Sequence, residues 1–78
     1  MPERKLRSAL KELGKENCPN CKREIGLIDA AWNEASTEYG TEYSVMQITC
    51  QACDTEVWHK ETWAAIESIE DFIEELHE

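Results

Sequence analysis

Four cysteines are arranged as two Cys-x-x-Cys pairs, and the chain has no other cysteine. Cys18 and Cys21 form the first pair, Cys50 and Cys53 form the second, and 28 residues separate the pairs. A Cys-x-x-Cys turn can place two thiolates on neighbouring vertices of one tetrahedron, and a folded insert can bring two such turns together. The spacing therefore predicts one site in which all four cysteines hold a metal ion.

Other uses of the four cysteines remain open. They can form disulfides in three pairings, or one pair can act as a redox centre. Residues 1–7 are basic but no apolar segment follows them, so we expect no secretory signal and a reducing, cytoplasmic location. A reducing compartment favours a metal site over disulfides.

The two cysteine pairs, the predicted hairpin between them and the short strand after them resemble the zinc-ribbon superfamily over about residues 17–58. Short phage and bacterial ribbons of the restriction-alleviation (Lar-like) type are similar in size and in the Ala-Ile segment after the second pair, here within residues 63–66. Their glycine after each pair is replaced by Lys22 and Asp54, and their terminal Trp-Asn motif is missing. The resemblance implies one structural zinc ion per chain and, for a phage-encoded protein, the host cytoplasm.

Two further resemblances leave the metal and the function open. The spacing, acidity and aromatic content are similar to rubredoxin, which implies an iron electron carrier. Rubredoxins carry glycine where Lys22 and Asp54 stand, and they typically have the Cys-Pro turn in the second pair, not in the first. A eukaryotic transcription elongation ribbon with an acidic C-terminal helix is also similar. Ribbons serve many roles, so these resemblances do not fix a function.

The elements around the cysteines are predicted to form a single small α+β domain over residues 1–78. A stripe of Leu6, Leu10 and Leu13 predicts a basic helix over residues 1–14. Ile66, Ile69, Ile73 and Leu76 recur at intervals of three and four residues, and they predict an amphipathic acidic helix over residues 60–77. We expect the two helices to pack on each other, although the second stripe can also form a dimer seam.

Three strands are predicted between these helices. β-forming residues favour strands over residues 25–32, 43–50 and 55–58, with a long loop over residues 33–42. The strands form the three-stranded zinc-ribbon sheet that positions the two cysteine pairs.

Charge is divided unevenly along the chain, whose net charge is −9. Residues 1–23 carry seven cations and three acids, whereas residues 24–78 carry one cation, Lys60, and fourteen acids. This acidity makes direct nucleic-acid binding improbable. No apolar stretch approaches the roughly 20 residues that span a bilayer, so we expect no membrane segment.

The sequence favours a non-catalytic protein-binding module, and we expect no enzyme activity. Four thiolates fill a tetrahedral site and leave no position for a reactive water. A zinc deaminase has its His-x-Glu motif before the cysteine pair, whereas His59 comes after both pairs here. We expect a small bacterial or phage regulator or inhibitor that docks on a basic, nucleic-acid-handling protein. The predicted docking residues are Trp32, Glu67, Glu70, Asp71, Glu74 and Glu75. The alternative is a transcription-type ribbon that binds nucleic acid through the basic N-terminal segment, with Arg4, Lys5 and Arg7.

Overall fold

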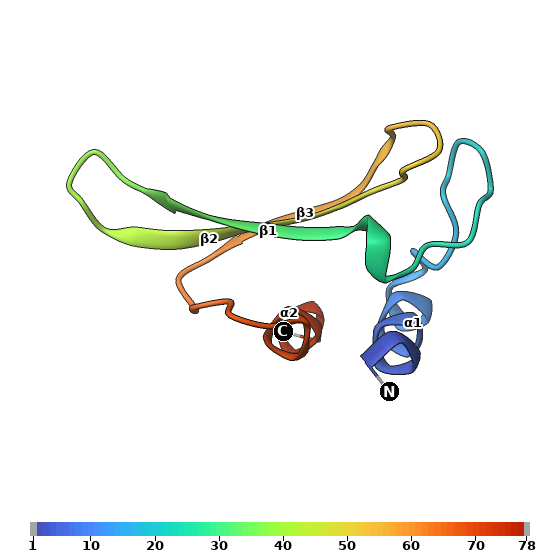
Figure 1. Ribbon diagram of the computed structural model, residues 1–78, viewed down its shortest axis with the longest axis horizontal. Coiled ribbons are helices and arrows are strands. Elements are labelled where there is room, and N and C mark those ends of the chain that lie inside the picture. The colour runs from blue at the N-terminus through green and yellow to red at the C-terminus, as the bar shows by residue number, and fades with distance from the viewer. Residues whose placement is uncertain (1, 78) are drawn as a thin grey trace.

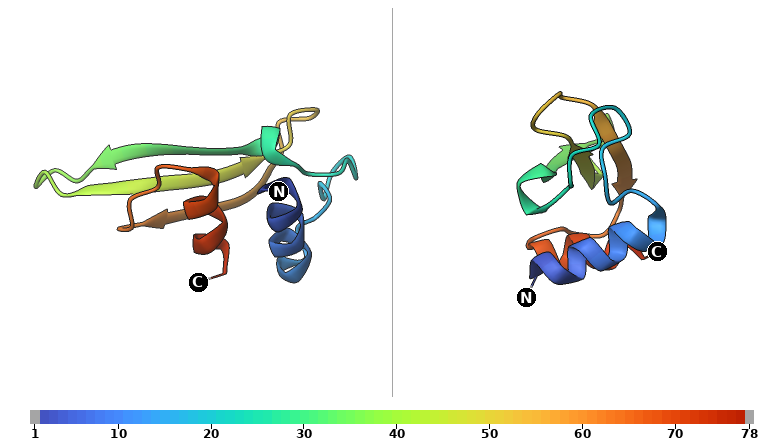
Figure 2. Two further views of the ribbon diagram at one scale, coloured as in Figure 1. Left: turned by 60° about the horizontal axis from the view of Figure 1, so that its bottom comes forward. Right: turned by 90° about the vertical axis from the view of Figure 1, so that its right-hand side faces the viewer.

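The computed structural model describes residues 2–77 and contains two α-helices and one sheet (Figure 1). In chain order the elements are α1 (Pro2–Leu13), the 3-10 helix η1 (Leu27–Asp29), β1 (Ala30–Ser36), β2 (Glu42–Thr49), β3 (Glu56–Thr62) and α2 (Ile69–Leu76). The predicted α+β class is confirmed. Both α-helices lie on one face of the sheet, and within residues 2–77 no helix covers the other face (Figure 2).

The N-terminal helix α1 forms where its apolar stripe predicts it. Leu6 and Leu10 are fully buried, whereas Leu13 is 39% exposed and lies at the edge of the core. Gly14 adopts a φ of 70°, and the N–H of Lys15 donates to the carbonyl of Leu10 at 2.8 Å. A glycine in the left-handed region followed by this backbone bond is a common helix stop, so α1 ends at the predicted position.

The sheet is antiparallel, with β2 between β1 and β3. Trp32 lies opposite Met46, and Ile48 lies opposite Trp58. Along β2 every second residue is buried, namely Ser44, Met46 and Ile48. This period of two is expected for a strand with one covered face, and that face is the one that meets the helices.

The core lies between the sheet and the two helices. Phe72 on α2 is fully buried, and its ring contacts Trp32 at 5.9 Å and Trp58 at 6.0 Å between centroids. Leu6 and Leu10 of α1 belong to the same apolar cluster, and α1 packs beside α2. The expected packing of the two helices is therefore confirmed.

The prediction of a strand over residues 25–32 is wrong for most of that range. Residues 27–29 form η1, and β1 begins only after it and continues into the predicted loop over residues 33–42. The N–H of Gly26 donates to the carboxylate of Asp29 at 2.8 Å, which closes a turn in place of an extended backbone. Both residue types are depleted in strands, and here the local turn overrides the apolar pattern.

The prediction of a helix over residues 60–77 is also too long. β3 continues to Thr62, past the predicted strand at residues 55–58, so the sheet extends beyond the expected ribbon boundary. Helix α2 begins after Ser68, whose hydroxyl accepts a hydrogen bond from the N–H of Asp71 at 3.4 Å. The Ser-x-x-Asp spacing is a helix-start signal that defines this boundary.

Candidate metal centre

The two Cys-x-x-Cys turns, here called knuckles, meet at one end of the sheet. The first knuckle follows α1, and the second joins β2 to β3 (Figure 1). All four sulfur atoms lie within 4.8 Å of one another. Sγ of Cys18 is 3.5 Å from Sγ of Cys53, and Sγ of Cys21 is 3.5 Å from Sγ of Cys50. The structure therefore brings together the four predicted ligands.

The sulfur arrangement fits a tetrahedral metal site. Metal–sulfur bonds of about 2.3 Å place neighbouring sulfurs about 3.8 Å apart on a tetrahedron, close to the observed spacing. The four cysteines are separate thiols, and Cys18 and Cys50 are fully buried. Four sulfur donors with this geometry can hold one metal ion, and the same donor set accepts zinc or iron.

The two knuckles have the same backbone hydrogen bonds. In the first, the N–H of Cys18 donates to the carbonyl of Arg23 at 2.8 Å. In the second, the N–H of Cys50 donates to the carbonyl of Thr55 at 2.9 Å. Each bond spans five residues and starts at the first cysteine of its pair, so both turns hold their sulfurs in an equivalent way.

The residue directly after each pair has a left-handed backbone. Lys22 has a φ of 67° and Asp54 a φ of 59°, and they are the non-glycine residues with positive φ among residues 2–77. Their N–H groups donate back to the carbonyls of Cys18 and Cys50, at 3.0 Å and 2.8 Å. These are the positions where the ribbons described above carry glycine. The chain thus keeps the knuckle conformation without the residue that adopts it most easily.

A buried carboxylate connects the knuckles. Asp29 has a fully buried side chain that pairs with the guanidinium of Arg23, the second residue after the first knuckle. The same carboxylate accepts the N–H of Gln51, inside the second knuckle, at 3.0 Å and the N–H of Gly26 at 2.8 Å. The Arg23 guanidinium also lowers the pKa of Cys50, because a nearby cation favours its thiolate. Ligand position and ligand charge therefore depend on one shared pair.

The pKa values of Cys53 and Cys21 shift in opposite directions. The hydrogen bond with Thr55, whose hydroxyl lies 3.1 Å from the sulfur, is the main cause that lowers the pKa of Cys53 to about 5. The backbone N–H of Arg23 lowers the pKa of Cys21, but the adjacent Cys50 and desolvation outweigh it and raise the pKa to about 11. A bound cation would favour the thiolate form of all four.

Neither Asp29 nor Arg23 was predicted from the sequence to belong to this centre. The available signal was an aspartate within the apolar run of residues 25–32, where a strand would place it among buried side chains. Buried carboxylates are nearly always paired, so a charged partner was to be expected. By contrast His59, considered above for catalysis, is exposed on β3.

The tryptophans differ from the prediction in their exposure. Trp32 was expected to be the exposed docking residue, but it is half-buried against Phe72. The exposed one is Trp63, with 70% of its surface accessible. Trp32 faces the side of the sheet that α2 covers. Trp63 is the residue directly after β3.

The acidic residues predicted to bind a partner have two kinds of surroundings. Three of them are exposed on or just before α2: Glu67, Glu70 and Glu74. Asp71 accepts the backbone N–H of Glu67 at 3.1 Å and so takes part in the helix cap. Glu75 is mostly buried and lies 3.5 Å from the ammonium of Lys60. The first three remain available to a partner.

No family model, curated protein or solved structure matches the chain. Within residues 2–77 no helix combines the length and the apolar character needed to cross a bilayer. The similarity to ribbons therefore depends on the cysteine cluster and its two equivalent knuckles.

Proposed function

We propose that this chain is a zinc-ribbon module that binds a basic protein partner and has no catalytic role. In this proposal one zinc ion holds Cys18, Cys21, Cys50 and Cys53 together. Four sulfurs complete the coordination of zinc and leave no position for a reactive water, so the metal acts as a structural clamp. Its binding free energy is then part of the folding free energy.

The observation that carries the partner proposal is the excess of negative charge beyond the first knuckle, where residues 24–78 have fourteen acids and one lysine or arginine. Lys60 is the single lysine or arginine after residue 23, and its ammonium is engaged by Glu75. The carboxylates of Glu67, Glu70 and Glu74 are exposed, and the lysine that shares a hollow with Glu70 and Glu74 is Lys5 of α1. A negative surface of this kind speeds the encounter with a positively charged protein surface, and it repels negatively charged partners. A nucleic-acid-handling protein has such a positive surface, and docking on it would make the chain a small regulator or inhibitor.

The alternative of direct nucleic-acid binding is less well supported. Arg7, one of its three expected contacts, donates to the backbone carbonyls of Glu16 and Ile25, each at 2.8 Å. Its guanidinium also pairs with Glu24 at 2.7 Å. The Arg7 side chain is thus engaged within the fold. Of the three expected contacts, Arg4 and Lys5 are exposed on α1.

The metal is tested by elemental analysis of protein purified without added metal. We expect one zinc per chain and a colourless protein. One iron per chain with visible thiolate-to-iron absorbance would instead support the rubredoxin-like alternative.

The partner proposal is tested by affinity capture from lysate of the source cell. The wild-type bait should retain a basic protein that elutes as salt rises from about 0.05 M to about 0.5 M. Glu70→Gln/Glu74→Gln should lose most of it, whereas the matched control Glu3→Gln/Glu56→Gln, also exposed, should retain it. Equal capture by both variants, or binding of duplex DNA that needs Arg4 and Lys5, would contradict the proposal.

A further inference from the structure

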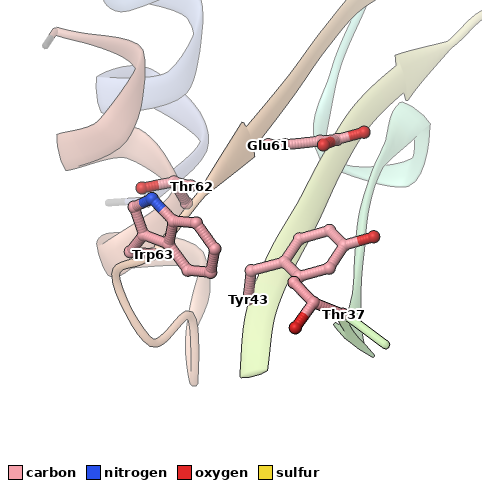
Figure 3. Close-up of a pocket in the computed structure, with 5 residues that line it drawn as sticks. All are labelled: Thr37, Tyr43, Glu61, Thr62 and Trp63. Carbon is pink, nitrogen blue, oxygen red and sulfur yellow. The ribbon is translucent and has the colours of Figure 1, made fainter. Parts of the chain in front are cut away.

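An aromatic cleft lies at the end of the sheet farthest from the cysteines. Its volume is about 320 Å³. Its walls are formed by the β1–β2 turn, by β2, by β3 and by the residue directly after β3. Figure 3 shows the lining side chains Thr37, Tyr43, Glu61, Thr62 and Trp63. The β1–β2 turn and the second knuckle occupy opposite ends of the sheet (Figure 1), so this cleft is separate from the metal centre.

Two aromatic rings form the apolar part of the cleft. Tyr43 and Trp63 lie 5.9 Å apart between centroids in an edge-to-face arrangement. Trp63 nevertheless keeps 70% of its surface exposed. Its partner Tyr43 precedes the buried Ser44 on β2 and so lies on the face of the sheet that neither helix covers. A tryptophan fixed at one edge and open on the remaining surface is well suited to anchor a partner.

Carboxylates stand on both sides of the aromatic pair. Glu61 lines the cleft itself, at the rim above Tyr43 in Figure 3. A second hollow of about 160 Å³ shares both rings and is lined by Glu34 and Glu42. All three carboxylate residues are exposed. The single lysine or arginine within residues 30–77 is Lys60, whose ammonium is engaged by Glu75. The surroundings therefore favour a cation over a neutral or anionic group.

We propose that this cleft receives an arginine side chain of the basic partner, an inference that rests on the proposed function and assigns its contact point. A guanidinium is planar, stacks on an aromatic face and can donate to a carboxylate from its edge. The exposed face of Trp63 and the carboxylate of Glu61 offer these two interactions together. A lysine ammonium satisfies the charge but has no plane to stack.

The direct test is an NMR titration of the zinc-loaded, ¹⁵N-labelled protein with acetylated pentapeptides Gly-Ser-X-Ser-Gly. With arginine as X, the indole N–H of Trp63 and the amide of Tyr43 should shift, with a Kd on the order of 1 mM. Lysine should bind at least about threefold more weakly. Citrulline, which keeps the shape of arginine without its charge, should cause no saturable shift. Equal shifts with arginine and citrulline, or none with arginine, would overturn the proposal.

Variants separate the cleft from the general acidity of the chain. Trp63→Ala should weaken arginine binding about fivefold and Trp63→Phe less, since tryptophan is the strongest cation–π partner. Glu61→Gln should weaken it as well. Matched controls are Tyr39→Ala, an aromatic residue 90% exposed and outside the cleft, and Glu56→Gln at the other end of β3. Both should bind as the wild type does, and every variant should keep its zinc content and melting temperature within a few degrees.

The remaining outcomes distinguish this inference from the proposed function. A captured partner that is lost with Glu70→Gln/Glu74→Gln but kept with Trp63→Ala would leave the acidic docking intact and refute the arginine cleft. Sedimentation should show a monomer for wild type and Trp63→Ala. Self-association of the wild type that Trp63→Ala abolishes would assign the cleft to a second copy of the chain and overturn the proposal.

Discussion

The Asp29 carboxylate accepts hydrogen bonds from the Arg23 guanidinium and from the backbone N–H of Gln51, which is 22 positions further along the chain, and so it joins the two cysteine knuckles. The Asp29 side chain has no exposed surface, whereas that of Arg23 is 31% exposed. With the backbone N–H of Gly26, the carboxylate satisfies three donors, two of them within residues 23–26 and one in the second knuckle. The knuckles are thus connected by protein contacts as well as by any shared metal.

The first prediction concerns this carboxylate. Asp29→Asn keeps the size of the side chain but places an amide against groups that all donate hydrogen bonds. We expect the free energy of unfolding to fall by about 2 kcal/mol, because buried hydrogen bonds to a charged acceptor are lost. Urea unfolding at fixed zinc excess measures the change. Glu24→Gln, which removes a largely exposed carboxylate, should have little effect, and an unchanged midpoint for Asp29→Asn would refute the role given to it.

The second prediction concerns the backbone after the first cysteine pair. Lys22→Gly should raise the free energy of unfolding by about 0.5–1 kcal/mol, because glycine adopts a φ of 67° without steric cost and this gain exceeds the entropy lost on folding. Asp54→Gly should gain less, because aspartate tolerates this region better than lysine. Lys22→Ala keeps the strain and serves as the control. A loss of stability in Lys22→Gly would mean that the Lys22 side chain matters more than its backbone.

The third prediction concerns metal removal. Chelation at neutral pH should unfold the chain, since binding of structural zinc contributes about 10–16 kcal/mol in small domains, as much as a whole small domain's stability. Two of the fully buried side chains in the core, Cys18 and Cys50, belong to the cysteine cluster that would hold the ion. Far-ultraviolet circular dichroism with a strong chelator and a thiol reductant measures the effect. A native spectrum in metal-free protein would show that the fold does not need the ion.

The fourth prediction separates fold from nucleic-acid binding on α1. Arg7→Gln should lower the free energy of unfolding by about 1–2 kcal/mol, because two backbone carbonyls and Glu24 lose their donor. Arg4→Gln should not alter stability, since Arg4 is exposed. Thermal melting of both variants measures the difference. Equal stability of the two would remove the argument that Arg7 is committed to the fold.

The features predicted correctly from the sequence are those that depend on interactions between residues close together in the chain. The spacing within each cysteine pair restricts where two sulfurs can lie, and the Leu6/Leu10 stripe with Gly14 specifies a helix and its end. These are short-range properties, so the cluster of four cysteines, α1 and the α+β class could be predicted from the sequence. The errors fell at residues 25–32 and 60–68, where turn and cap hydrogen bonds at Asp29 and Ser68 compete with an apolar pattern.

The sequence by itself determined that the four cysteines form two Cys-x-x-Cys pairs that can make one site. It also determined that residues 1–23 have a positive net charge and residues 24–78 a negative one. Only the tertiary structure decided that Asp29 joins the knuckles, that Arg7 is committed to the fold, and that Trp63, not Trp32, is the exposed tryptophan. The reason is that burial depends on which face of the sheet the helices cover. α2 packs against Trp32 and Trp58 through Phe72 on the covered face. Tyr43 alternates with the buried residues of β2 and lies on the other face, and Trp63, which packs edge-to-face on Tyr43, stays open to solvent.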